Sequence, residues 1–207
     1  MTKQKAPPGR VVYPIGNRLY VNLTSGCSLK CSFCFKNTGR GPQVHDYDLA
    51  LERQPSPTDI RKGLADLEGY EEVVFCGFGE PTLRLPTLLE IAEFIQRQGK
   101  PVRLNTDGLA NRVFRRDVTP QLAGRVDRVS VSLNAQDAET YNRLCRPPWP
   151  DAFDYLQDFI RKAREQVEQV TATAVEGLEG VDIEACRRLA EEELGVEFRP
   201  RQLDRVG

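Results

Sequence analysis

Apolar positions along the chain follow two different periods. Short apolar runs rich in β-branched residues occur six times, at 19–23, 73–76, 102–104, 126–133, 170–175 and 196–198. Between these runs, apolar residues recur at intervals of three and four, which is the spacing of an amphipathic helix. The helical stripes cover 60–67, 88–95, 153–163 and 181–194. The pattern predicts strands that alternate with helices.

Residues at the helix ends support this assignment. The run Ser56-Pro57-Thr58-Asp59 has the form of a capping box with proline at the first helical position. Gly99 and Gly195 follow the second and the last stripe, where a helix C-cap favours glycine. These helices are therefore expected to return the chain to a strand.

Alternating strands and helices predict an α/β fold with a parallel sheet, because parallel neighbours need a crossover of this length. A closed eight-unit barrel usually takes about 250 residues. Six units in 207 residues suit an incomplete barrel better, although the periodicity alone also allows a doubly wound sheet. We expect one core domain over 16–207, preceded by a short N-terminal arm over 1–15.

Charge and hydropathy narrow the function classes. The chain has 29 basic and 30 acidic residues, so it lacks the global basic field that drives nonspecific nucleic-acid binding. No apolar run approaches the roughly 18 residues that a bilayer crossing needs, and the chain opens without an apolar signal segment. The expected location is the cytoplasm, where cysteines stay reduced and do not form a disulfide framework.

Three closely spaced cysteines carry the strongest chemical signal. Cys27, Cys31 and Cys34 follow the first predicted strand directly. Spacings of four and three residues allow one loop to bring three thiolates to a single inorganic centre. A cubic four-iron cluster has four corners, so three protein ligands leave one iron open to a reactant. The pattern predicts an iron–sulfur site that does chemistry.

Two other readings of these cysteines stay open. A zinc-stabilised binding module needs a fourth ligand, and the single histidine, His45, lies eleven residues beyond Cys34. An electron-transfer protein would use the same cluster with a fourth cysteine at suitable spacing, which the sequence lacks. Cys76 and Cys186 are predicted to be small buried residues, and Cys145 is expected in a loop stiffened by Pro147 and Pro148.

The cysteine spacing, with Phe33 just before the last cysteine, resembles the signature of the radical SAM superfamily. The resemblance implies a partial (β/α)6 TIM-like barrel and two cofactors, a [4Fe-4S] cluster and S-adenosylmethionine (SAM). It also implies an enzyme that accepts electrons from an external donor. Such an enzyme cleaves SAM reductively to a 5′-deoxyadenosyl radical that abstracts hydrogen from its substrate, here unknown.

A second motif follows the second predicted strand. Gly77, Phe78, Gly79, Glu80 and Pro81 resemble the Gly-Gly-Glu-Pro motif that holds the SAM amino group in radical SAM enzymes. Phe78 takes the place of the first paired glycine, and this departure is similar to the adenosine-methylating branch. The resemblance also places cofactor contacts near the end of the fourth predicted strand, where we select Ser132 and Asn134. Asn105, at the end of the third, is a further candidate contact, with a polar strand-to-turn cap as the alternative.

Longer segments are similar to one small subgroup, the TatD-associated radical SAM proteins. They are 17–24, 75–85, 130–147 and 181–187. The linkage to TatD-type hydrolases makes a nucleic-acid-related substrate worth testing beside a small molecule. Arg199 and Arg201 follow the sixth predicted strand, where a guanidinium meets a carboxylate or phosphate of a substrate; a surface role is the alternative.

Overall fold

All six predicted strands lie in one seven-stranded sheet of the computed structural model, which describes residues 9–39 and 41–203. The strand order is β1-β2-β5-β6-β7-β8-β9, with every pair parallel except β1 and β2. The strands are β1 (Val12–Ile15), β2 (Arg18–Val21), β5 (Glu72–Phe75), β6 (Val102–Thr106), β7 (Arg128–Ser132), β8 (Gln169–Glu176) and β9 (Glu197–Gln202).

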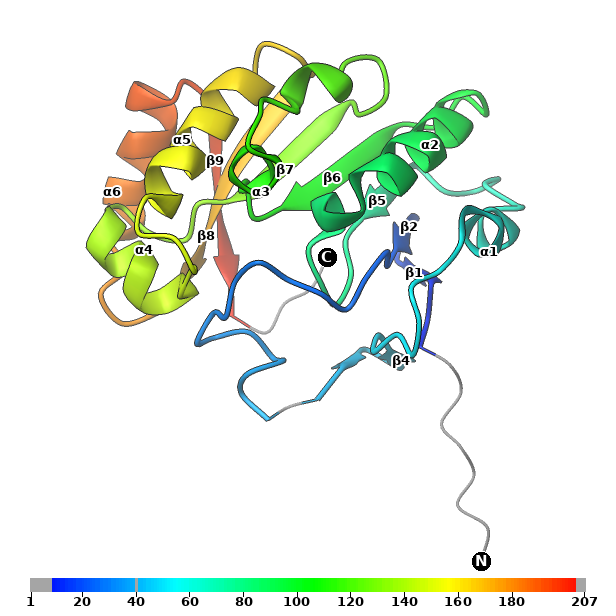
Figure 1. Ribbon diagram of the computed structural model, residues 1–207, viewed down its shortest axis with the longest axis horizontal. Coiled ribbons are helices and arrows are strands. Elements are labelled where there is room, and N and C mark those ends of the chain that lie inside the picture. The colour runs from blue at the N-terminus through cyan, green and yellow to red at the C-terminus, as the bar shows by residue number, and fades with distance from the viewer. Residues whose placement is uncertain (1–8, 40, 204–207) are drawn as a thin grey trace, which may run out of the picture.

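Helices follow the parallel strands and pack on one face of the sheet (Figure 1). They are α1 (Pro57–Gly63), α2 (Leu85–Gln96), α3 (Ala110–Phe114), α4 (Ala138–Cys145), α5 (Ala152–Ala163) and α6 (Ile183–Arg188). One-sided cover on a mostly parallel sheet is the layout of an open barrel, so the predicted partial barrel is confirmed. No helix in the described residues is both long and apolar enough to cross a membrane.

Alternating side chains give the two faces of the sheet different characters. In β6, Val102 and Leu104 are buried under the helices, whereas Arg103 and Asn105 point to the opposite, concave face. The register aligns Arg103 with Arg128 of β7, so polar residues from neighbouring strands form rows on the concave face. This face is the one available to a ligand.

The N-terminal residues add structure that the periodicity did not predict. β1 pairs antiparallel with β2, so the sheet extends into the segment expected to be an arm; residues 1–8 lie outside the described part of the chain. A hairpin of two-residue strands, β3 (Gln43–Val44) and β4 (Tyr47–Asp48), covers part of the concave face. The hairpin packs against the sheet through a buried apolar cluster of Tyr13, Tyr20, Val44, Leu49 and Val74.

Several helix predictions need correction. The first helix ends at Gly63, and Leu67 is buried in the turn beyond it. The last stripe divides into α6 and a π-helical turn, Leu189–Glu193, before Gly195 adopts a φ of +66°. The short helices α3 and α4 were not predicted. As a result, Cys145 is the buried last residue of α4 and not part of a loop.

Removing the cap of α1 tests the predicted capping box. Ser56 Oγ accepts from the Asp59 amide at 3.2 Å, and Asp59 Oδ2 accepts from the Ser56 amide at 2.9 Å. Ser56→Ala should lower the free energy of unfolding by about 1 kcal/mol in urea denaturation, because a helix amide loses its acceptor. The control Thr58→Ala, at an exposed position of the same turn, should change it by less than about 0.5 kcal/mol. Equal effects of the two changes would contradict the capping role.

Candidate functional site

The predicted site residues gather at one edge of the sheet, where the parallel strands end. The cysteine loop follows β2 and the glycine motif follows β5, while Asn105 lies near the end of β6 and Ser132 ends β7. Ligand sites of parallel α/β folds form in these loops because all the strands point to the same edge. The structure therefore brings together segments separated by more than 100 residues.

The cysteine loop and the glycine motif are in direct backbone contact. The Glu80 amide donates to the Gly26 carbonyl at 2.8 Å, one residue before Cys27. A Cβ atom on Gly79 would lie 2.0 Å from that same carbonyl oxygen, far inside van der Waals contact. Only glycine permits this approach of two backbones.

The other end of the cysteine loop is held by α4. The Lys30 amide donates to the Cys145 carbonyl at 3.1 Å, and the Ser32 amide donates to the Leu144 carbonyl at 2.8 Å. The Cys31 thiol also lies next to the thiol of Cys145. Sequence reasoning missed this contact because α4 itself was not predicted.

The three predicted metal ligands lie on one loop whose burial favours their protonated thiol forms. Burial raises the pKa of Cys27 to about 12 and also raises that of Cys34, while the neighbouring Cys145 thiol and burial raise that of Cys31. Across residues 9–39 and 41–203, no three Cys, His, Asp or Glu side chains are gathered as a metal site. Since the thiolate is the metal-binding form, a cluster would displace these protons and draw the sulfurs together.

Phe78, the departure from the glycine motif, packs against the cysteine loop. Its ring lies 5.3 Å from the ring of Phe35, and Lys36 Nζ lies 4.7 Å from the ring centroid. Its amide donates to Asn22 Oδ1 at 3.1 Å. The bulky side chain thus packs against the two residues that follow Cys34. Phe33 is half-buried against the main apolar core.

Two buried carboxylates lie beneath the loop. Glu80 is 5% exposed, and its Oε1 accepts from the Thr82 amide at 3.0 Å and from the Thr106 hydroxyl at 2.8 Å. Its Oε2 accepts from the Asp107 amide at 2.8 Å. The Asp107 carboxylate in turn accepts from the Ser28 hydroxyl, inside the cysteine loop. Asp107, which was not among the predicted site residues, therefore connects the end of β6 to the cysteine loop.

The environment of this pair disfavours its ionised form. Burial and the neighbouring Asp107 raise the pKa of Glu80, and burial raises the pKa of Asp107. Within the described part of the chain, neither carboxylate forms a salt bridge to a basic side chain. A cationic group placed here would stabilise the ionised carboxylates.

Amide oxygens at the ends of β6 and β7 also lack partners. Asn105 Oδ1 and Asn134 Oδ1 are buried without a hydrogen bond from any described residue. Asn134 adopts a φ of +61°, a conformation that residues other than glycine seldom adopt. Ser132, two residues before it, is half-buried. Buried polar atoms normally have partners, so these oxygens fit the donors of a bound molecule.

Comparisons with known proteins agree with this geometry. The family model of the Radical SAM superfamily matches residues 21–192. A GTP 3′,8-cyclase of Streptomyces coelicolor is 33% identical over 134 residues, which cover 64% of this chain and 37% of that protein. A cofactor-modifying protein for tungsten-containing aldehyde ferredoxin oxidoreductase, from Pyrococcus furiosus, is 32% identical over 94 residues, covering 44% of this chain and 23% of the relative.

Solved structures show the same fold. The crystal structure of Streptococcus suis SuiB bound to S-adenosylmethionine superposes with a TM-score of 0.63 at 18% identity, covering 89% of this chain and 38% of that one. At this identity the likeness concerns the fold. The chain spans less than half the length of the curated relatives it matches.

Proposed function

The chain belongs to the Radical SAM superfamily, and on that premise we propose that it is an enzyme in which Cys27, Cys31 and Cys34 hold a [4Fe-4S] cluster and the neighbouring motif holds SAM. When bound, this pair supplies the one-electron cleavage of SAM and a carbon radical that abstracts hydrogen from a substrate. An external electron donor completes the reaction, and we place the enzyme in the cytoplasm.

The backbone junction between Gly26 and Gly79 is the observation that carries the proposal. It joins the loop with three cysteines to the loop with the glycine motif, so a molecule bound by one also contacts the other. A cluster with three thiolate ligands has one corner for a second ligand. That ligand would lie beside the glycine motif.

The charge and polarity of the site fit SAM as that ligand. SAM carries an ammonium and a sulfonium, and the buried Glu80–Asp107 pair lacks a cation. The ribose hydroxyls and the amino group of SAM supply donors, and Asn105 and Asn134 present unpartnered acceptors. We therefore assign Gly77, Gly79 and Glu80 to the amino-acid end of SAM, and Asn105, Ser132 and Asn134 to the remainder of the molecule.

The other residues of the site have positioning roles in this proposal. Asp107 holds Ser28, which lies between two of the ligands, and so orients the cysteine loop. Phe33 and Phe78 form apolar walls that exclude water from the site. Cys31 would give up its thiol proton, beside Cys145, to bind iron.

The substrate assignment follows the subgroup. On the segments given above, we assign the chain to the TatD-associated proteins and propose a small-molecule or nucleic-acid-related substrate. The names of the relatives point to different substrates, since one is a GTP 3′,8-cyclase and another a cofactor-modifying protein. The names of these relatives therefore do not identify one substrate for this chain.

Anaerobic reconstitution with iron and sulfide tests the proposal against its alternatives. We expect about four iron atoms per chain, a change in the electron paramagnetic resonance spectrum of the reduced cluster on adding SAM, and release of 5′-deoxyadenosine. An iron–sulfur cluster whose spectrum does not change when SAM is added would indicate an electron-transfer protein. Bound zinc without thiolate-to-iron absorption would indicate a zinc-stabilised module.

A further inference from the structure

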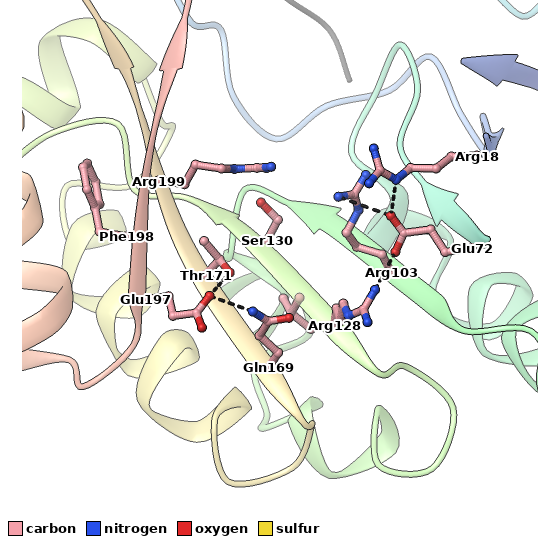
Figure 2. A pocket seen from close by; sticks show the side chains of 11 residues that line it. Arg18, Glu72, Arg103, Arg128, Ser130, Gln169, Thr171, Glu197, Phe198 and Arg199 are labelled. Carbon is pink, nitrogen blue, oxygen red and sulfur yellow. Dashed lines mark hydrogen bonds and ion pairs between the residues drawn. The ribbon is translucent and has the colours of Figure 1, made fainter. Parts of the chain in front are cut away.

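The concave face of the sheet contains a second feature, a cavity of about 380 Å³ at the amino-terminal half of the strands. It lies away from the strand ends that carry the cysteine loop. The charged residues that line it are Arg18, Glu72, Arg103, Arg128, Glu197 and Arg199 (Figure 2). They come from β2, β5, β6, β7 and β9.

The cavity has an excess of positive charge. Glu72 is 3% exposed and forms ion pairs with Arg18 at 2.7 Å, Arg103 at 3.5 Å and Arg128 at 3.3 Å. One carboxylate cannot neutralise three guanidinium groups. With Arg199 and Glu197 included, four arginines face two glutamates, which leaves a net charge of +2.

Two of the arginines also have unused hydrogen-bond donors. The Arg103 side chain is 11% exposed, and its Nε has no partner among the described residues. The Arg199 side chain is exposed and forms no hydrogen bond or ion pair within the described part of the chain, and Figure 2 shows it extending toward Ser130. A guanidinium presents a planar fork of N–H donors that matches the oxygens of a phosphate or carboxylate.

The concave face of the sheet leads from the lining of the cavity toward the proposed SAM site. Arg199 pairs in register with Thr173, and Thr173 pairs with Ser132 at the end of β7. Ser130, which lines the cavity, precedes Ser132 on the same face by two residues, about 7 Å along the strand. A molecule held by these arginines can therefore extend toward the strand ends.

We propose that this cavity binds an oxyanion group, phosphoryl or carboxylate, of the substrate, with Arg199 and Arg103 as its principal donors. The assignment of this anion to a substrate rests on the proposed function. Anion binding itself needs neither cluster nor SAM. The structural alternative is that Glu72 and its three arginines only join the amino-terminal ends of the strands. In that alternative the exposed Arg199 side chain is only solvated.

Calorimetric titration of the iron-free protein with pyrophosphate, and separately with citrate, tests the proposal in a chloride buffer, because both anions would chelate the iron of a cluster. We expect one anion site per chain, weakened by added salt. Arg199→Gln should weaken binding about tenfold, the loss expected for one charge-assisted contact. Arg199→Lys should retain part of the affinity, because it keeps the charge without the planar fork.

The matched control is Arg97→Gln at the C-cap of α2, whose exposed side chain pairs with Glu93 on the helix-covered side of the sheet. The Arg97→Gln protein should bind pyrophosphate and citrate with the same affinity as the unaltered protein. Tighter binding of pyrophosphate would assign a phosphoryl group, and tighter binding of citrate a carboxylate. No binding of either anion, or equal binding by Arg199→Gln, would overturn the proposal. Neither result depends on SAM cleavage, so the absence of anion binding would leave the proposed function standing. Absence of SAM cleavage with intact anion binding would count only against the proposed function.

Discussion

Cys31→Ala should abolish iron binding and SAM cleavage together. The loop offers three thiols for one cluster, and removal of the central one leaves two ligands that cannot hold it. Iron content after reconstitution should fall from about four atoms per chain to near zero, and 5′-deoxyadenosine should fall to the background of iron-free protein. The loop should otherwise stay in place, because its backbone bonds to Glu80, Leu144 and Cys145 do not involve the Cys31 side chain.

Cys186→Ala is the matched control for this change. Cys186 is a fully buried free cysteine of α6, outside the cysteine loop. Its replacement should lower the free energy of unfolding and leave iron content unchanged, because its role is packing. A Cys31→Ala protein that still bound four iron atoms and cleaved SAM would place the cluster elsewhere in the chain.

Gly79→Ala should damage cofactor binding far more than it damages the fold. The new Cβ would lie 2.0 Å from the Gly26 carbonyl oxygen and 2.6 Å from that of Thr24, and both are backbone atoms that cannot turn aside. The cysteine loop must then move by about 1 Å, a displacement that typically costs about 100-fold in rate. We expect SAM cleavage to fall by about that factor, measured under anaerobic single-turnover conditions.

Gly124→Ala separates this clash from ordinary backbone strain. Gly124 has a φ of +68° and open space around its Cα, so alanine there should cost about 1 kcal/mol of stability and leave cleavage unchanged. If the Gly79→Ala and Gly124→Ala proteins cleaved SAM equally well, the backbone contact between Gly26 and Gly79 would not be the basis of the cofactor site.

Strand and helix positions were predictable wherever one period dominated a long segment. The alternation of β7 and the stripe of α5 are examples, since each buries one face against the same core. The β3–β4 hairpin was not predictable, because two-residue strands are too short to show a period. The helix α4 was missed because polar residues separate its buried positions, Thr140, Tyr141, Leu144 and Cys145.

Within the candidate site, the separate motifs were visible in the chain but their contacts were not. Glu80 was predicted as a ligand contact, and the structure adds that its carboxylate already joins β5 to β6 through Thr106 and Asp107. Asp107 follows two polar residues at a strand end, and nothing in its spacing indicates a bond to Ser28, 79 positions earlier. The arginines of the cavity likewise share no local pattern.

The sequence by itself determined the parallel α/β class, the three cysteines on one loop and the glycine motif after the next strand. These are local properties, since periodicity, capping and ligand spacing act over a few residues. Only the tertiary structure decided that Gly79 lies against Gly26, that Asp107 holds the cysteine loop, and that four arginines meet Glu72 and Glu197 in one cavity. Such contacts depend on strand order and register, which bring distant segments together through burial of the whole sheet under its helices.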